Sequence, residues 1–134
     1  MAFERYNSEP NIQVFKKVAS TAFTKGALVA VDANGFITPA VTASASNDLM
    51  GIIQRTVAST DADYAQNTYV EVDTFVRKMD WFVADVGTGT PAQTDVGEAV
   101  EIDNSLTVDV VAVATPLVRV EKIISATKVV VSFI

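Results

Sequence analysis

Short apolar runs separated by turn residues recur along the chain and predict an all-β fold. Val, Ile and Thr fill the runs, whereas Gly, Asn, Asp and Pro separate them. Residues 27–31 form a nearly continuous apolar run, as expected for a strand covered on both faces. Asn34 and Gly35 lie between this run and residues 36–38. Because both tolerate positive φ, the sequence predicts a β-hairpin here.

Further strands are expected along the rest of the chain. Residues 49–53 fit a strand with Gly51 at a bulge. Residues 69–77 alternate between Val or Thr and charged residues, as in a strand with one exposed face. Helix is expected only as one or two turns at residues 59–66, and residues 11–19 fit either a strand or a helix. The other predicted strands span residues 81–84, 99–102, 107–114, 117–124 and 128–133.

Two segments of the chain echo each other. Residues 25–32 (KGALVAVD) resemble residues 96–103 (VGEAVEID), and a turn containing Asn34 or Asn104 follows. Two β units related by pseudo-symmetry would explain the echo. Chance similarity explains it equally well, because turn chemistry imposes the same residues. The expected fold is a small antiparallel β-sandwich or barrel with hairpins and little helix, and two pseudo-repeated units are one form of it.

The first twenty residues differ in character from the rest. Pro10 interrupts regular structure here. Residues 1–20 therefore form either the first edge strand of the domain or an extended arm that grips a neighbouring subunit by adding a strand. Residues 21–134 are expected to form a single β domain. Four large apolar side chains of the N-terminal segment are candidate interface residues: Phe3, Tyr6, Ile12 and Phe15.

Composition excludes several kinds of chemistry. The 134-residue chain contains neither Cys nor His. Disulfides, thiolate zinc sites, cysteine nucleophiles and Ser-His-Asp catalysis are therefore impossible. We expect no enzyme activity, no cofactor and no metal site.

The acidic and glycine-rich motifs do not change this expectation. Asp61 and Asp63 have the spacing of a calcium loop but lack its third acid, turn glycine and distal Glu. Residues 87–90 (GTGT) lack the Lys of a phosphate-binding loop, and Pro91 follows them. Three further acids flank this loop without a ligand-like spacing: Asp80, Asp85 and Asp95.

Charge argues against a polyanionic partner. The net charge is −6, and the ten basic residues are scattered. Nucleic-acid binding requires clustered Lys and Arg, so it is not expected. Residues 108–120, the most apolar stretch, contain Asp109 and Arg119 and do not resemble a membrane span. No leader-like segment is seen at the N-terminus, so we expect a soluble protein made in a reducing cytoplasm.

Trp81 and Phe82 form the densest aromatic pair of the chain. Adjacent aromatic residues in a β protein usually belong to the core. The alternative is an interface anchor, because Trp is enriched at binding hot spots. Both residues are therefore candidate interface residues.

Several segments resemble the small capsid decoration, or cement, proteins of tailed bacteriophages. Residues 24–40 (TKGALVAVDANGFITPA) are similar to the opening of these proteins, and residues 49–53 and 69–72 continue the likeness. Residues 95–103 and 127–133 resemble the second half of the family.

The resemblance implies a β-rich virion protein without enzyme activity. It would lie on the outer capsid surface and bridge capsomers after synthesis in the bacterial host cytoplasm. Its implied partners are the major capsid protein and neighbouring copies of itself. The negative charge and the apolar content agree with such a role.

Two other functions compete with capsid decoration. Another virion assembly protein, such as a tail-tube, head–tail joining or fibre-base protein, would also be β-rich. A small-ligand or carbohydrate-binding β-sandwich would use exposed aromatic rings for stacking, with Tyr64, Tyr69 and Trp81 as candidates.

Overall fold

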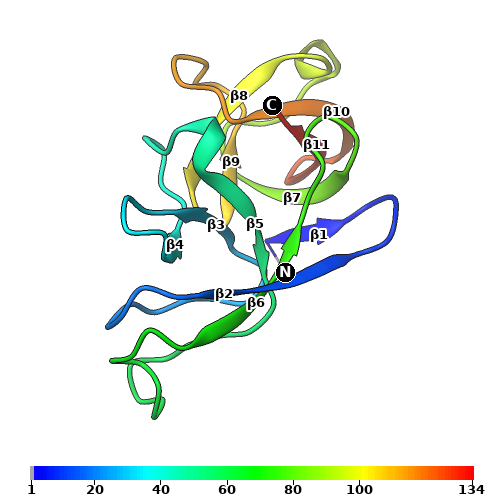
Figure 1. Ribbon diagram of the computed structural model, residues 1–134. Coiled ribbons are helices and arrows are strands. Elements are labelled where there is room, and N and C mark those ends of the chain that lie inside the picture. The colour runs from blue at the N-terminus through cyan, green and yellow to red at the C-terminus, as the bar shows by residue number, and fades with distance from the viewer. Residues whose placement is uncertain (1) are drawn as a thin grey trace.

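Antiparallel strands make up nearly all the regular structure of the chain (Figure 1). The computed structural model describes residues 2–134. These residues form two sheets and two 3₁₀ turns, Ser46–Asp48 and Gln93–Asp95, which confirms the all-β prediction. The strands are β1 (Phe3–Arg5), β2 (Asn11–Lys16), β3 (Leu28–Val31), β4 (Ile37–Pro39), β5 (Leu49–Ile53), β6 (Tyr69–Thr74), β7 (Trp81–Thr88), β8 (Ala99–Asn104), β9 (Thr107–Asp109), β10 (Val118–Ser125) and β11 (Lys128–Phe133).

The second half of the chain closes into a small barrel. Its strand order is β7-β11-β10-β8-β9, and β9 returns to pair in parallel with β7. Figure 1 shows these strands as a ring. β1 lies outside the ring and pairs antiparallel with β7, so the N-terminus of the chain joins the barrel formed by its C-terminal half.

The first half repeats this topology. Its sheet has the order β2-β6-β5-β3-β4, so each strand corresponds to the strand five places later in the chain. A parallel bridge between Lys17 and Ile37 joins the ends of β2 and β4, as the β7–β9 pairing does in the barrel. The first sheet is therefore a second barrel with an incomplete seam.

Hydrogen bonds support the repeat in detail. The Gly26 N–H donates to the Ile53 carbonyl at 3.0 Å, and the Gly97 N–H donates to the Val120 carbonyl at 2.7 Å. The two glycines have nearly the same positive φ, 90° and 91°. Each is the second residue of one of the two segments whose sequences echo each other, so the echo falls at equivalent positions of two units with the same strand order.

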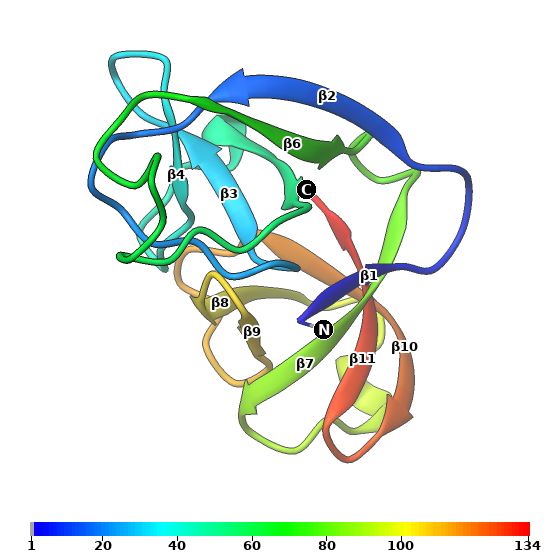
Figure 2. The same ribbon diagram turned by 90° about the horizontal axis from the view of Figure 1, so that it is seen from below.

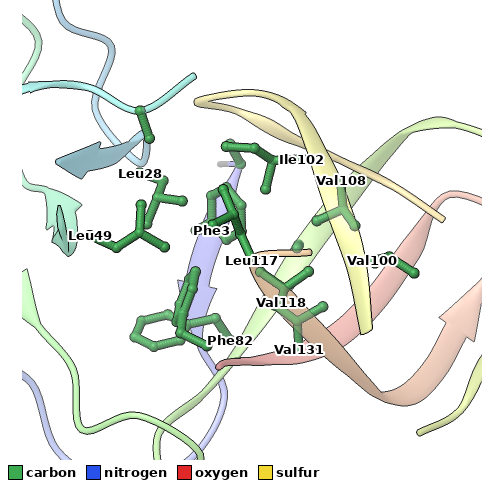
Figure 3. Close-up of a cluster of buried hydrophobic side chains, with 14 of the residues drawn as sticks. Phe3, Leu28, Leu49, Phe82, Val100, Ile102, Val108, Leu117, Val118 and Val131 are labelled. Atoms are coloured by element: carbon green, nitrogen blue, oxygen red, sulfur yellow. The ribbon is translucent and has the colours of Figure 1, made fainter. Parts of the chain in front are cut away.

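Two apolar cores follow from the two units. The smaller core lies inside the first unit, where Val29, Ile53 and Val72 pack together. The larger core fills the barrel and continues onto the opposite face of β3 and β5. Figure 3 shows Leu28 and Leu49 of the first unit pointing toward the barrel side chains. β3 is buried on both faces, as its continuous apolar run predicts.

The predicted hairpin and bulge are both present. β3 and β4 pair around a turn in which Gly35 has a φ of 84°, and the Asp32 carboxylate accepts the Asn34 N–H at 2.9 Å. In β5, Val29 faces Gly51 while Ala30 faces Leu49, which leaves an extra residue as a bulge.

Three local predictions are wrong. Residues 59–66 form hydrogen-bonded turns without a helix. β6 ends at Thr74, before the end of the alternating pattern, and Val76 is exposed in the following turn. The strand expected at residues 107–114 ends at Asp109, where that residue's carboxylate accepts the N–H groups of the next turn.

The N-terminal segment is an integral part of the fold. β1 and β2 are edge strands of different sheets, joined by residues 6–10 (Figure 2). Arg5 joins β1 to the sheet that contains β2, since its guanidinium donates at 2.7 Å to Asp73 of β6, the strand paired with β2. Residues 3–5 and 11–16 are therefore edge strands of the fold, and the contact with a neighbouring subunit stays a prediction.

Candidate interaction surface

Two of the six predicted interface residues belong to the core instead. Phe3 is 1% exposed and Phe82 is fully buried. Their rings lie 6.0 Å and 5.5 Å from that of Phe133, within the larger core (Figure 3). The prediction of an interface role for these two is wrong, because the pleat turns both side chains into the barrel.

Tyr6 and Trp81 meet on the outer surface of the barrel. Their rings stack with centroids 6.3 Å apart, and the Lys122 ammonium lies 5.6 Å from the Tyr6 ring. Asn7 connects this pair to Met79, since its side chain bonds both the Met79 carbonyl and the Trp81 N–H. Met79 is 70% exposed. We call Tyr6, Met79, Trp81 and Lys122 the aromatic patch.

A second exposed apolar surface lies on β2. Ile12 and Val14 point to the same face of the sheet and are exposed, while Phe15 points to the other face and packs on the smaller core. Tyr69 of β6 lies opposite Lys16, whose ammonium is 5.6 Å from the Tyr69 ring.

Sequence reasoning identified Ile12 but missed its neighbour Val14. The alternation of Ile12 and Val14 indicates a strand, but Ile12, Phe15 and Val18 have helical spacing. Other exposed valines, such as Val111 and Val113, lie in the loop after β9 that was expected to be a strand.

The acidic motifs have structural roles. Asp61 accepts the Ala58 N–H at 2.8 Å, and Asp63 pairs with Arg55 at 2.7 Å. The acids around the glycine-rich loop each have a different partner. Asp80 bonds Ser8 and Arg5, Asp85 pairs with Lys128, and Asp95 accepts the Ala92 N–H.

Of residues 87–90, the first two end β7, and Gly89 follows them as a bend. The Thr88 hydroxyl donates to Asp103 at 2.7 Å. Gly89, with a φ of 86°, passes so close to Val110 and Val111 that a Cβ would lie within 2.8 Å of both side chains.

The ion pairs shift the pKa values of their members. A hydrogen bond from Arg55, joined by one from the Thr68 hydroxyl, lowers the pKa of Asp63. At Asp80, partial desolvation opposes ionisation, but hydrogen bonds from Ser8 and neighbouring groups keep the pKa below its ordinary value of 3.8. The hydrogen bond to Asp73 raises the pKa of Arg5.

The described residues offer surfaces rather than a cavity. No ligand-sized pocket and no cluster of three metal-ligating side chains is found among residues 2–134. In the same part of the chain, no helix is long and apolar enough to cross a membrane. Comparison with protein-family models and with curated protein sequences gives no match.

Proposed function

We propose that the protein is a virion structural protein that binds the outer surface of a phage capsid and stabilises the shell. The observation that carries this proposal is the exposure of large apolar side chains on a double barrel whose described residues, 2–134, form no ligand-sized pocket. Such side chains on a folded surface are typical of sites that contact other macromolecules. The resemblance to phage decoration proteins supplies the identity of the partner.

The aromatic patch is the proposed contact with the shell. Tyr, Trp and Met are enriched in protein interfaces, and stacked aromatic rings lose little side-chain entropy on binding. Hydrogen bonds hold the patch together, because Tyr6 donates its N–H to the Trp81 carbonyl at 2.8 Å and the Asn7 side chain donates to the Met79 carbonyl just before β7. Many copies on one shell would make a modest affinity per copy sufficient.

Mixing the protein with phage shells that lack their decoration protein tests the proposal. We expect the protein to sediment with the shells and to raise the temperature at which they break. Tyr6→Ala combined with Met79→Ala should weaken sedimentation with the shells. Val41→Ala, at an exposed valine outside the patch, should not.

Shells that neither bind the protein nor gain thermal stability would contradict the proposal. Rings or tubes formed by the isolated chain in electron micrographs would favour a tail-tube or joining protein instead. A carbohydrate-binding role has weaker support. Tyr69 and Trp81 lie on strands of different sheets, and Trp81 is already stacked on Tyr6.

A further inference from the structure

The barrel shows how β1 binds the part of the β7 edge that β9 does not cover. β1 lies antiparallel along the first half of β7, with Glu4 opposite Val83. The Tyr6 N–H donates to the Trp81 carbonyl at 2.8 Å, and the Asp85 N–H donates to the Ala2 carbonyl at 3.1 Å. The backbone groups of alternate β7 residues therefore point toward β1, and those of the residues between point toward β11.

β2 occupies the position in the first unit that β7 occupies in the barrel, but no strand of the described residues pairs with its outer edge. The Lys17 N–H donates to the Thr68 carbonyl, as the Val86 N–H does to the Thr127 carbonyl, so Lys17 corresponds to Val86. Counting back three residues places Val14 where the barrel has Val83, the centre of the β1 pairing.

The backbone of this edge is unsatisfied. Because Lys17 points its N–H at β6, the alternate residues Ile12, Val14 and Lys16 point theirs away from it. Within residues 2–134, Ile12 and Val14 have no strand partner on that side, whereas the parallel Lys17–Ile37 bridge occupies the end of the strand at Lys16; β2 is the last strand of its sheet (Figure 2). An exposed edge strand of this kind is a template for pairing with another chain.

The side chains of β2 are complementary to a second copy of themselves. Ile12 and Val14 form the exposed apolar centre, Glu9 precedes the strand and Lys16 ends it. An antiparallel two-fold pairing brings the apolar centres together. It also brings the acidic end of each strand near the basic end of the other. A parallel pairing would place like charges side by side.

We propose that β2 is a dimerisation edge that pairs antiparallel with β2 of a second copy, joining two five-stranded sheets into one. Ile12 then lies opposite Val14 of the second copy, and Gln13 lies on the two-fold axis. Lys16 lies beside Pro10 of the second copy, whose missing N–H suits the last position of the ladder.

Sedimentation of the purified chain tests the proposal without any shell. We expect a dimer. Val14→Lys should weaken dimerisation by about tenfold or more, because each dimer carries the substitution twice at the apolar centre. Val41→Lys is the matched control, since Val41 is 56% exposed and Val14 is 59% exposed. Circular dichroism checks that both variants keep the β fold.

A cysteine at the axis tests the register independently. The chain has no Cys, so Gln13→Cys introduces a single thiol. Directly opposed residues in a non-hydrogen-bonded pair lie within disulfide range. We therefore expect Gln13→Cys to oxidise to a covalent dimer rapidly and Val41→Cys to do so slowly.

Three outcomes would overturn the proposal. These are a monomer at every accessible concentration, a dimer that Val14→Lys leaves unchanged, and equal crosslinking of the two cysteine variants. A monomer that loses shell binding on Val14→Lys would assign the edge to a strand of the shell instead. Normal shell binding by a monomeric variant would leave the proposed function intact.

Discussion

Gly51 lets β5 pass unusually close to β6. A Cβ at this position would lie 2.2 Å from the backbone carbonyl oxygen of Asp73, and neither backbone can move without breaking its ladder. We expect Gly51→Ala to lower the free energy of unfolding by about 2 kcal/mol or more. Urea denaturation measures the change.

Gly35 is the natural control for this substitution. It also has a positive φ, but a Cβ added to it in the hairpin turn would meet no atom within 4 Å. Gly35→Ala should therefore destabilise only through backbone strain, by about 1 kcal/mol. Equal losses for the two variants would contradict the steric explanation at Gly51.

Lys17 is a buried cation that organises a loop. Its ammonium donates to the backbone carbonyls of Asp63, Tyr64 and Gln66 at 2.8, 3.1 and 2.6 Å. Lys17→Met should destabilise the fold by about 3 kcal/mol, because these carbonyls lose their donor. Hydrogen exchange should rise at residues 63–68, whereas Lys25→Met at an exposed position should change neither measurement.

At the scale of elements, Arg5 fastens β1 to the first unit. It bonds the buried Asp73 carboxylate at 2.7 Å and the Thr74 carbonyl at 3.0 Å, and its guanidinium lies 5.0 Å from the Phe82 ring. Arg5→Met leaves Asp73 buried without its cation, so we expect a loss of about 3 kcal/mol in unfolding free energy. An unchanged midpoint of urea denaturation would contradict this role.

Asp80, which also pairs with Arg5, makes the stability of the fold sensitive to acid. The pKa of Asp80 is lowered in the folded protein, so the folded state binds a proton less readily than the unfolded state. Its contribution to stability is complete above the ordinary value of 3.8 and is lost as the pH falls through the lower folded-state pKa. Unfolding free energies measured from pH 7 downward should fall below about pH 4. Asp80→Asn should reduce that slope.

Strand positions followed from the sequence better than strand ends. The runs at residues 27–31 and 128–133 are buried enough that pattern and structure agree. Val76 and Val111 continue the apolar pattern yet lie in turns, because Asp80 and Asp109 bond the turn N–H groups there. Side-chain-to-backbone bonds of this kind compete with strand pairing and leave no periodic signal.

The sequence identified the candidate aromatic side chains but not which of them are exposed. Phe3 and Tyr6 look alike in sequence, but they lie on opposite sides of the barrel wall. Their sides depend on the register between β1 and β7, which joins segments about eighty residues apart in the chain. No local pattern encodes that register.

At the scale of the whole molecule, the larger core links the two units. Leu28 of β3 is buried against barrel residues, and the Leu28 N–H donates to the Ser105 carbonyl at 2.7 Å. We expect Leu28→Ala to cost about 3 kcal/mol and to destabilise both units together. Fluorescence of Trp81, the single tryptophan, reports on the barrel, and hydrogen exchange in β6 reports on the other unit. Separate transitions would contradict this coupling.

The sequence indicates the repeated topology in only one pair of segments, residues 25–32 and 96–103. Turn glycines and the strands after them are alike in the two units, whereas Lys17 replaces the apolar Val86 at an equivalent position. Two units that share a topology need the same turns but not the same side chains, since each packs against a different neighbour. The two units are therefore similar in sequence only where the backbone conformation restricts the choice of residue.

β1 makes the two units unequal in their capacity for assembly. It covers the edge of β7 with a strand of only three residues, and the Phe3 N–H is already bonded to Gly26. In the proposed dimer each copy pairs through β2 alone, so it joins a single neighbour and growth then stops. With β1 removed, β7 would be a second open edge, and each copy could link two others into an unlimited chain. In that arrangement the N-terminal strand limits each copy to one neighbour.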